Sequence, residues 1–455
     1  MEEKKNNLGI IKELIPLFAF EIVLLTLFNF ANLSVVYRVM AVVVASVAVI
    51  PIIKSMPRDK SIIPLVLQIG SIFLYLLLSV TFGHIATQNI FTIIVIVLGG
   101  IGFYIIGIYY GVFKEKKVDI SKLLSAFYLG IGLFTIVSLI ATLYGIGTPF
   151  YAVIFLNPDN AIRRELVDRA RIIIDIFRDL DFTYATPNNF GVAILANFAL
   201  LSASGFYVTI LTNMKDNKFL WLSSLIGGIC GLLTIILIPI FFDLIIFIFG
   251  LVLTILLKNK SKITKYYFIY LGVSALVLGV LYMVFRIDNH LHPEHYEDLN
   301  YILEAILFQK IGIFKYFANL KYFLSLPPKI VGSSIGAEFS YISSGTIITD
   351  VLYQSGILPL ICLLLFMGVG IIELVKYLKS DDNLNVKVGI TSLILFFVIS
   401  LIINYVGILL TESFVFLGII MLFAYVVGYN LRSKKSLIKQ EVVKENKEKE
   451  AITND

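Results

Sequence analysis

Residues 91–112 read FTIIVIVLGGIGFYIIGIYYGV and carry no charged side chain. An α-helix rises about 1.5 Å per residue, so about 20 apolar residues cross the hydrocarbon core of a bilayer. Backbone polar groups in lipid must be hydrogen-bonded inside the element, and this stretch therefore predicts a membrane-spanning helix. Similar runs recur along the 455-residue chain, which is 58% hydrophobic and only 15% charged. The sequence predicts an all-α polytopic membrane protein.

Twelve such spans are predicted along the chain. The apolar run 219–257 is too long for one helix, and we divide it near Pro239 and Asp243, a helix breaker and a charge. The predicted spans are residues 12–30, 35–53, 62–82, 91–112, 123–143, 189–212, 219–238, 241–257, 266–284, 353–376, 387–408 and 412–429. Residues 1–430 then form a single membrane domain, and the highly charged tail 431–455 is predicted to be disordered.

Lysine and arginine concentrate in alternate connections between these spans, which the positive-inside rule places in the cytoplasm. The basic connections are residues 54–60, 114–122, 213–218, 258–265 and 376–387. Both termini are then cytoplasmic, and two long loops, 144–188 and 285–352, lie on the outer side. Because the other outer connections are short, we expect the functional site in these two loops.

The net charge of +6 follows from the same pattern, so it does not indicate a nucleic-acid partner. Cys230 and Cys362 lie far apart in apolar runs, which argues against a disulfide or a metal site. Residues 290–295 (HLHPEH) contain three of the four histidines of the chain. Pro293 interrupts that group and no helical spacing is evident, so a solvated loop is favoured over a zinc site.

The loop 144–188 contains five arginines and no lysine, although lysine outnumbers arginine about threefold in the chain. Five of its charges alternate in sign at spacings of 4, 3, 4 and 3 residues: Arg164, Asp168, Arg171, Asp175 and Arg178. This spacing places them on one stripe of a predicted amphipathic helix. One interpretation is a set of exposed salt bridges, since six acids in the loop offset the arginines. The other is phosphate binding, because the guanidinium fork binds phosphate bidentately and positive charge is otherwise avoided on the outer side.

Further candidate residues lie in the second long loop, which Arg286 opens. Lys315 belongs to a basic and aromatic segment (302–326) that predicts one or two interfacial helices, whose lysine stems snorkel to the surface. Glu338 and Asp350 are the acids nearest the start of the tenth span. Each of these two acids either caps a helix or acts as a base or ligand for an acceptor hydroxyl.

Three short motifs in and beside the outer loops carry a resemblance. The first is an arginine-bearing loop followed by TPNNFG at 186–191. The second is a basic and aromatic helix followed by a glycine turn, IFKYFANLKYFLSLPPKIVGSSIG at 313–336. The third is TDVLYQSGILPLI at 349–361, where an acid precedes a Gly-Ile pair. Together with two large outer loops after the fifth and ninth spans, these motifs resemble the O-antigen polymerase and ligase family of bacterial surface-polysaccharide assembly.

The resemblance implies a metal-independent glycosyltransferase without a cofactor, located in the cytoplasmic membrane of a bacterium. It would move a growing glycan (capsular, exopolysaccharide or O-antigen) from undecaprenyl diphosphate onto a hydroxyl of the next lipid-linked repeat unit. The candidates for binding the diphosphate are Arg164, Arg171, Arg178, Arg286 and Lys315. Asp350 and Glu338 are the candidate bases. The expected partners are the lipid-linked oligosaccharide, the bilayer, and a flippase and chain-length regulator of the same pathway.

Two departures from the family pattern favour a polymerase over a ligase. Ligases of the family carry a His about ten residues before the glycine of the third motif, where this chain has Thr346, and often a Ser-Arg pair where it has IPIFFD (238–243). A flippase or exporter of lipid-linked glycans is the rival from another class, since twelve spans also suit a transporter. Transporters place polar groups in mid-bilayer, whereas these spans are nearly free of charge: Glu21 is the deepest acid, Arg38 is shallow and Glu373 lies near an edge.

The two interpretations of the arginine helix predict different effects for the substitutions Arg171→Lys and Arg178→Lys. Lysine keeps the charge and loses the planar fork, so phosphate binding predicts loss of polymer with normal expression of the protein. Electrophoresis of surface polysaccharide from cells that carry each variant measures the loss, and immunoblotting of their membranes is the control. Unchanged polymer in both variants would support the salt-bridge interpretation.

Overall fold

The computed structural model describes the chain in separate stretches, and every regular element within them is helical. The described residues are 31–56, 60–83, 89–113, 120–144, 198–237, 247–248, 327–334, 347–380, 383–403 and 416–433. For residues 31–37, 137–144, 236–237, 347–350 and 399–403 the backbone alone is described. Six helices in these stretches are long and apolar enough to cross a membrane, so the prediction of a helical membrane protein is confirmed.

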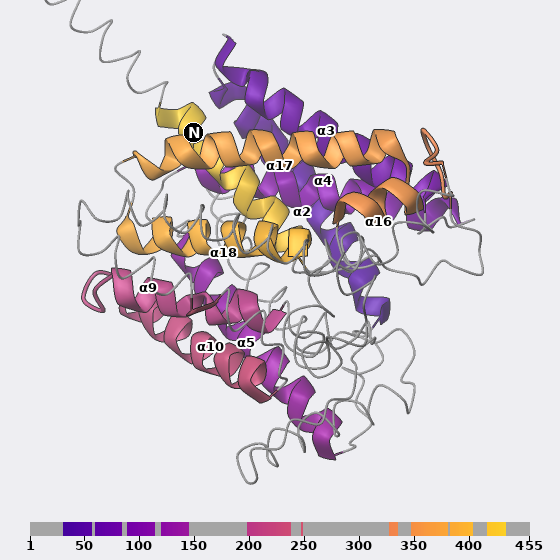
Figure 1. Ribbon diagram of the computed structural model, residues 1–455. Helices are drawn as coiled ribbons and strands as arrows, with labels where there is room; N and C mark the ends of the chain where they lie inside the picture. The colour runs from indigo at the N-terminus through magenta and orange to yellow at the C-terminus, as the bar shows by residue number, and fades with distance from the viewer. Residues whose placement is uncertain are drawn as a thin grey trace, which may run out of the picture.

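The helices of the N-terminal half agree closely with the predicted spans (Figure 1). Their bounds are α2 (Ala31–Ser55), α3 (Ile63–Phe82), α4 (Ile90–Val112) and α5 (Ile120–Tyr144), with a 3-10 turn, η1 (Lys60–Ile62), before α3. Pro64 lies in the first turn of α3, where a missing N–H breaks no intrahelical hydrogen bond. Asn89 caps α4, because its side chain accepts a hydrogen bond from Phe91 N at 2.9 Å.

The helices of the C-terminal half follow the first long loop. Phe198–Leu211 is apolar and contains α9 (Gly205–Leu211), and after it come α10 (Lys218–Leu237), α16 (Ile347–Gln354), α17 (Ile357–Leu378), α18 (Leu384–Ile403) and the yellow helix Phe416–Ser433. The predicted spans 12–30 and 266–284, and nearly all of 241–257, lie outside the described residues. The count of twelve spans, the sidedness of the termini and the tail 431–455 beyond Ser433 therefore stay predictions.

The start of the tenth span differs from the prediction. The sequence predicts one helix over 353–376, but the structure ends α16 at Gln354 and begins α17 at Ile357. Gly356 separates them with φ of +106°, a left-handed conformation that a right-handed helix cannot include. Most of α16 thus lies inside the stretch 285–352 that the sequence assigns to a loop.

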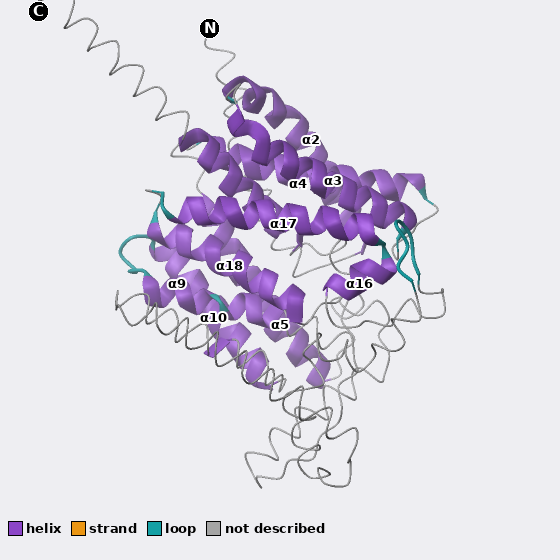
Figure 2. Ribbon diagram, turned by 45° about the horizontal axis from the view of Figure 1, so that its top comes forward, coloured by secondary structure: helices purple, strands orange, loops and turns teal. Residues whose placement is uncertain are grey.

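The described helices pack in two groups, which both ribbon views show (Figures 1 and 2). In the first group α2 packs on α4, α4 on α3, and α3 on α17; in the second α5 packs on α10 and α10 on α9. α18 contacts both groups, through α17 of the first and through α5 and α9 of the second, and it also contacts α16. The helix Phe416–Ser433, which is buried over 89% of its length, also joins the groups through contacts with Gly107 of α4 and Phe127 of α5.

α3 and α17 form an antiparallel pair that determines the site. Near one end of the pair, Gln68 Nε2 donates to the carbonyl of Phe366 at 3.4 Å. At the other end, Gly83 lies so close to Ser355 that an added Cβ would be 2.7 Å from its Oγ. The final turn of α3 is therefore level with the break at Gly356.

Glycines let several of these helices approach backbone to backbone. A Cβ built on Gly132 of α5 would lie 2.6 Å from Gly227 Cα of α10. On α4, added Cβ atoms at Gly107 and Gly111 would lie 2.2 and 2.4 Å from carbonyl oxygens of the helix Phe416–Ser433. Gly107 and Gly111 have the small-xxx-small spacing of closely packed membrane helices. Because lipid tails are as apolar as the helix surfaces, such packing depends on van der Waals contact.

The outward faces of the helices carry large apolar side chains. Val43, Ile50 and Ile53 on α2 are each at least 60% exposed, and Ile361 and Ile372 on α17 are more than half exposed. A water-facing surface of this kind promotes aggregation, whereas lipid solvates it. The exposed faces are the lipid-facing surface of a membrane protein.

Substitution of Gly132 by Ala is expected to destabilise the α5–α10 contact, by about 1–3 kcal/mol, because the new methyl group meets backbone atoms that cannot move aside. Gly70→Ala in α3 is the matched control, since a Cβ there meets no atom of the described residues within 4 Å. That variant should gain about 0.5–1 kcal/mol from better helix propensity. The stability of both variants is measured by thermal unfolding in detergent, with size-exclusion chromatography to detect the folded protein. Equal unfolding midpoints for the two variants would contradict the close packing of α5 on α10 at Gly132.

Candidate functional site

The chain forms a compact junction where α16 meets α17. We call it the α16–α17 junction: residues 353–358, the segment 327–334 (orange in Figure 1, beside the start of α17) and the last turn of α3. Four backbone hydrogen bonds connect the segment 327–334 to residues 353–358. They are Ser334 N to Tyr353 O at 2.8 Å, Gly332 N to Ser355 O at 3.0 Å, Ile357 N to Lys329 O at 3.0 Å and Leu358 N to Ile330 O at 3.0 Å.

These hydrogen bonds cap the start of α17. The first N–H groups of a helix have no intrahelical acceptor, and here the carbonyls of Lys329 and Ile330 accept from Ile357 and Leu358. The approach requires glycine at position 356, since a Cβ there would lie 2.7 Å from the Ile330 oxygen. The break in the helix and the docking of the segment 327–334 are therefore one structural feature.

The segment 327–334 is itself closed into a turn. Ser334 Oγ donates to the carbonyl of Pro327 at 3.1 Å and accepts from the Lys329 N–H at 3.0 Å. Gly332 adopts φ of +96°, which favours glycine, and lies over the last carbonyl of α3, that of Phe82. Residues 327–330 are exposed to solvent and residues 331–334 are half-buried.

Three polar residues of the α16–α17 junction are buried. Ser79 in the last turn of α3 is 1% exposed, Gln354 is 6% exposed and Ser355 is 7% exposed. Ser79 Oγ makes no hydrogen bond within the part of the chain that the structure describes. A buried hydroxyl without a partner costs about 1–3 kcal/mol, so this group calls for an explanation.

Of the predicted site residues, only Asp350 lies within the described stretches. It belongs to α16, one helical turn before Gln354, and only its backbone is described. The other candidates, Arg164, Arg171, Arg178, Arg286, Lys315 and Glu338, lie outside the described residues. The structure does bring together KIVGSS (329–334) and DVLYQSGI (350–357), which belong to the second and third motifs of the sequence.

A stripe of buried polar residues runs along α3 from the junction towards the middle of the first helix group. Ser79, Tyr75, Ser71 and Gln68 recur at spacings of three and four residues, and each is at most 4% exposed. Gln68 uses both ends of its amide, because Oε1 accepts from the Tyr104 hydroxyl at 2.8 Å and Nε2 donates to the Phe366 carbonyl. This stripe was not predicted from the sequence, although its helical spacing is a readable signal.

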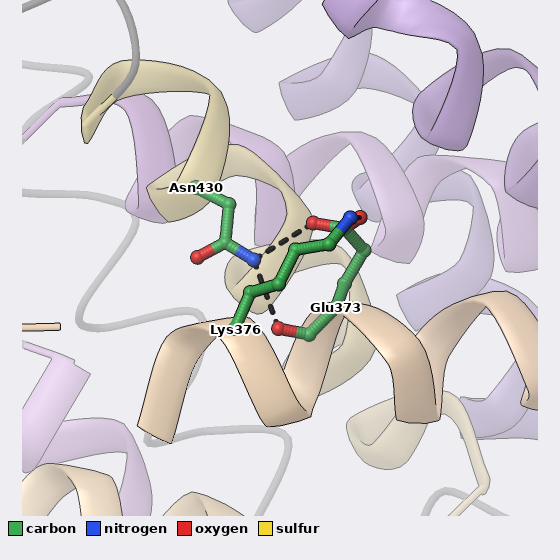
Figure 3. A network of polar contacts seen from close by, with 3 residues as sticks. All are labelled: Glu373, Lys376 and Asn430. Atoms are coloured by element: carbon green, nitrogen blue, oxygen red, sulfur yellow. Dashed lines mark hydrogen bonds and ion pairs between the residues drawn. The ribbon is translucent and has the colours of Figure 1, made fainter. Parts of the chain in front are cut away.

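Glu373 lies at the opposite end of the α3–α17 pair, in a polar cluster with Lys376 and Asn430 (Figure 3). Asn430 Nδ2 donates to Glu373 Oε2 at 2.8 Å and to the Glu373 carbonyl at 2.9 Å, and Lys376 Nζ forms an ion pair with Glu373 Oε1. The side chain of Glu373 is only 4% exposed, whereas that of Lys376 is 49% exposed. The sequence indicates a position near an edge of the span but not that the carboxylate is buried between two helices.

Arg38 of α2 is also buried, at 3% exposure. Its side chain packs over Gly99 of α4, and Nη1 donates to the Ile96 carbonyl at 3.4 Å. The sequence places Arg38 at a shallow position in its span, and its depth in the membrane stays a prediction. The structure adds that the side chain is buried, because the absence of a side chain at Gly99 lets the arginine stem pack between the two helices.

A second buried asparagine has a different environment. Asn385 in the first turn of α18 is fully buried, and neither of its side-chain polar atoms has a hydrogen-bond partner within the described chain. Asn430, in contrast, makes both of its hydrogen bonds to Glu373. Comparison of the two residues therefore measures how much a hydrogen-bonded amide contributes to the stability of the fold.

These helices and contacts define an integral membrane protein whose interior contains several buried polar residues. Among the described residues no group of three or more His, Cys, Asp or Glu side chains is placed to hold a metal, and residues 290–295 lie outside them. Neither a protein-family model nor a curated protein matches the chain.

Replacement of Asn430 by Leu is expected to lower the free energy of unfolding by about 1–3 kcal/mol, because it leaves a buried carboxylate with fewer hydrogen bonds. Asn385→Leu is the control, and it should be neutral or stabilising, since Leu has a similar volume and removes two unpartnered polar atoms. Thermal unfolding in detergent compares them. An equal loss of stability in both variants would contradict the assigned role of Asn430.

Proposed function

We propose that the chain is a polymerase of lipid-linked oligosaccharide repeat units at the outer face of the cytoplasmic membrane of a bacterium. The observation that carries this proposal is the α16–α17 junction, where backbone hydrogen bonds connect parts of two sequence motifs that resemble the O-antigen polymerase and ligase family. The motifs are separate in the sequence, and their contact is what a shared functional site requires. The helical membrane fold supports the same proposal.

In the proposed reaction the oxygen of an acceptor hydroxyl attacks the anomeric carbon of the growing glycan. The bond between that carbon and the diphosphate oxygen breaks, and undecaprenyl diphosphate leaves with the electron pair. Asp350 accepts the proton of the hydroxyl, with Glu338 as the alternative base. The products are a glycan that has grown by one repeat unit, on the lipid of the acceptor, and free undecaprenyl diphosphate.

The leaving diphosphate needs compensation for its negative charge. We assign that role to the basic residues of the two long loops, Arg164, Arg171, Arg178, Arg286 and Lys315. Arginine binds diphosphate oxygens in pairs through its planar fork, and positioned cations stabilise charge that develops in the transition state. With such residues the proposed reaction requires neither a metal ion nor a cofactor.

A ligase, which attaches the glycan to a different acceptor, is less well supported. Relatives with ligase activity carry a histidine where this chain has Thr346, and hydroxyl and imidazole differ in their ability to take up a proton.

Flipping or export of the lipid-linked glycan is the second candidate function, and specific observations favour it. Arg38 and Glu373 are buried between helices, and the helix is broken at Gly356. Buried ionisable residues and interrupted helices are features of membrane transporters. The apparent lack of charge in the predicted spans therefore does not separate the two classes.

Deletion of the gene distinguishes a polymerase from a flippase. Loss of a polymerase should leave surface polysaccharide of single-repeat length, whereas loss of a flippase should leave the lipid-linked unit on the cytoplasmic side. Complementation with Asp350→Asn should restore normal protein levels without restoring polymer, because the amide cannot accept the proton. Electrophoresis of surface polysaccharide reads the result, and unchanged polymer length and amount after the deletion would overturn the proposal.

A further inference from the structure

Contacts between the helices of the first group determine which of their ends lie together. α2 is parallel to α4, α4 to the helix Phe416–Ser433, and that helix to α17, because in each pair the contacts advance along both helices in the same direction. These contacts are Arg38 with Gly99 and Ala41 with Gly102, Gly107 with Met421 and Gly111 with Tyr425, and Phe423 with Phe366 and Asn430 with Glu373. α3 is antiparallel to α17. The ends of α2, α4, α17 and Phe416–Ser433 therefore lie together with the start of α3.

The second group has corresponding helix ends on the same side. Lys387 in the first turn of α18 donates to the carbonyl of Ser380, just beyond the end of α17. Gly389, two residues further along α18, accepts from the Tyr128 hydroxyl of α5 at 3.1 Å, and an added Cβ there would lie 3.8 Å from Val208 of α9. The start of α5, the end of α9 and the start of α10 are thus near the end of α17. Figure 1 shows the turn between α9 and α10 on the same side as the end of α17.

This end of the molecule contains nine of the eleven basic residues that the structure describes, and we call it the basic end. The nine are Lys54, Lys60, Lys122, Lys215, Lys218, Lys376, Lys379, Lys387 and Arg432. The other two are Arg38, which packs on Gly99, and Lys329 in the segment 327–334 at the start of α17. Among the described acids, Asp216 and Glu373 belong to the basic end. The described residues there therefore carry a clear excess of positive charge.

Three of the nine basic residues interact with other groups of the protein. Lys376 forms an ion pair with Glu373, Lys387 donates to a carbonyl beyond α17, and Arg432 lies over the Tyr429 ring at 5.9 Å. The remaining six are lysines on several helices and turns, so they form a distributed surface and not a single pocket. All six are exposed: Lys54, Lys60, Lys122, Lys215, Lys218 and Lys379.

Exposed apolar side chains adjoin three of these lysines, each one residue further into the helix. The side chains are Ile53, Phe219 and Leu378, beside Lys54, Lys218 and Lys379, and they are 67%, 57% and 45% exposed. A phospholipid presents the same order of groups, a phosphate at the water and acyl chains beneath it. Lysine stems can follow acyl chains while the ammonium group stays with the phosphates. A nucleic acid or an acidic soluble protein would match the lysines but not their apolar neighbours.

We propose that the basic end binds anionic phospholipids of the leaflet around it in preference to zwitterionic ones. The phosphates lie at the exposed lysines, and the acyl chains lie on the adjoining apolar side chains. A lysine near an anionic membrane surface strengthens binding by about fivefold. The proposal concerns the end of the molecule opposite to the α16–α17 junction and does not depend on polymerase activity. The sequence predicts that this end is cytoplasmic.

The single tryptophan of the chain, Trp221, is a natural probe for this surface. It is half-buried in the first turn of α10, donates from Nε1 to the Thr209 carbonyl at 3.2 Å, and follows Lys218 by three residues, so both lie on one side of the helix. The purified full-length chain is reconstituted into phosphatidylcholine nanodiscs that contain either brominated phosphatidylglycerol or brominated phosphatidylcholine. Bromine quenches tryptophan fluorescence on contact, and the ratio of the two quenching curves gives the lipid preference.

We expect a preference of about threefold to fivefold for phosphatidylglycerol at low salt. It should fall towards one at about 1 M NaCl, where the Debye length is only about 3 Å. The double substitution Lys215→Gln and Lys218→Gln should abolish the preference near Trp221. Lys329→Gln is the matched control, since it removes an exposed lysine from the opposite end and should keep the wild-type preference. Size-exclusion chromatography and circular dichroism confirm that the variants are folded.

Three results would overturn the proposal. Equal quenching of the wild-type protein by the two brominated lipids would show that the basic end does not select anionic lipid. A preference that survives in the double variant would show that these lysines do not cause it. Loss of the preference on addition of excess glycerol phosphate would assign the surface to soluble phosphates and not to lipid. None of these measurements uses polymer formation, so failure of the polymerase proposal leaves this one to be judged separately.

Discussion

A helix that begins inside a membrane protein has first N–H groups that lipid cannot satisfy, and the architecture around α17 follows from that constraint. Gly356 ends the preceding helix, and the carbonyls of Lys329 and Ile330 accept from the first N–H groups of α17. A segment that is distant in the sequence is thereby held at the end of α3. The segment 327–334 makes this contact through its backbone, and its residues 327–330 are exposed.

The α3–α17 pair carries polar groups along its length, from the junction to the Glu373 cluster. Gln68 and Tyr104 lie between these ends and are hydrogen-bonded to each other, while Ser79 remains without a partner in the described chain. Buried polar groups stabilise a fold only when they are satisfied. Gln68 connects α3 with α17, which belong to different halves of the sequence, and Asn430 joins the helix Phe416–Ser433 to α17.

Local sequence signals were sufficient for the helices but not for the environment of their polar residues. The bounds of α3 and α4 follow from hydropathy alone, with Pro64 and Asn89 marking the starts. The burial of Arg38 cannot be predicted in this way, because it depends on Gly99, which belongs to another helix. Asp350 was identified as a candidate from its position in a motif, whereas the contact of Gly83 with Ser355 was not predicted, since it joins parts of the chain that are distant in the sequence.

The sequence by itself determined that this is a helical membrane protein and where most of its described helices lie, because the bilayer imposes a length and a hydropathy that can be read residue by residue. It also indicated the motif segments and the basic loops. Only the tertiary structure decided that residues 327–334 cap α17, and that the polar stripe of α3 is buried. Both features depend on the close approach of backbones at glycines and on how helices from distant parts of the sequence align with one another. Neither can be predicted from the composition of a single span.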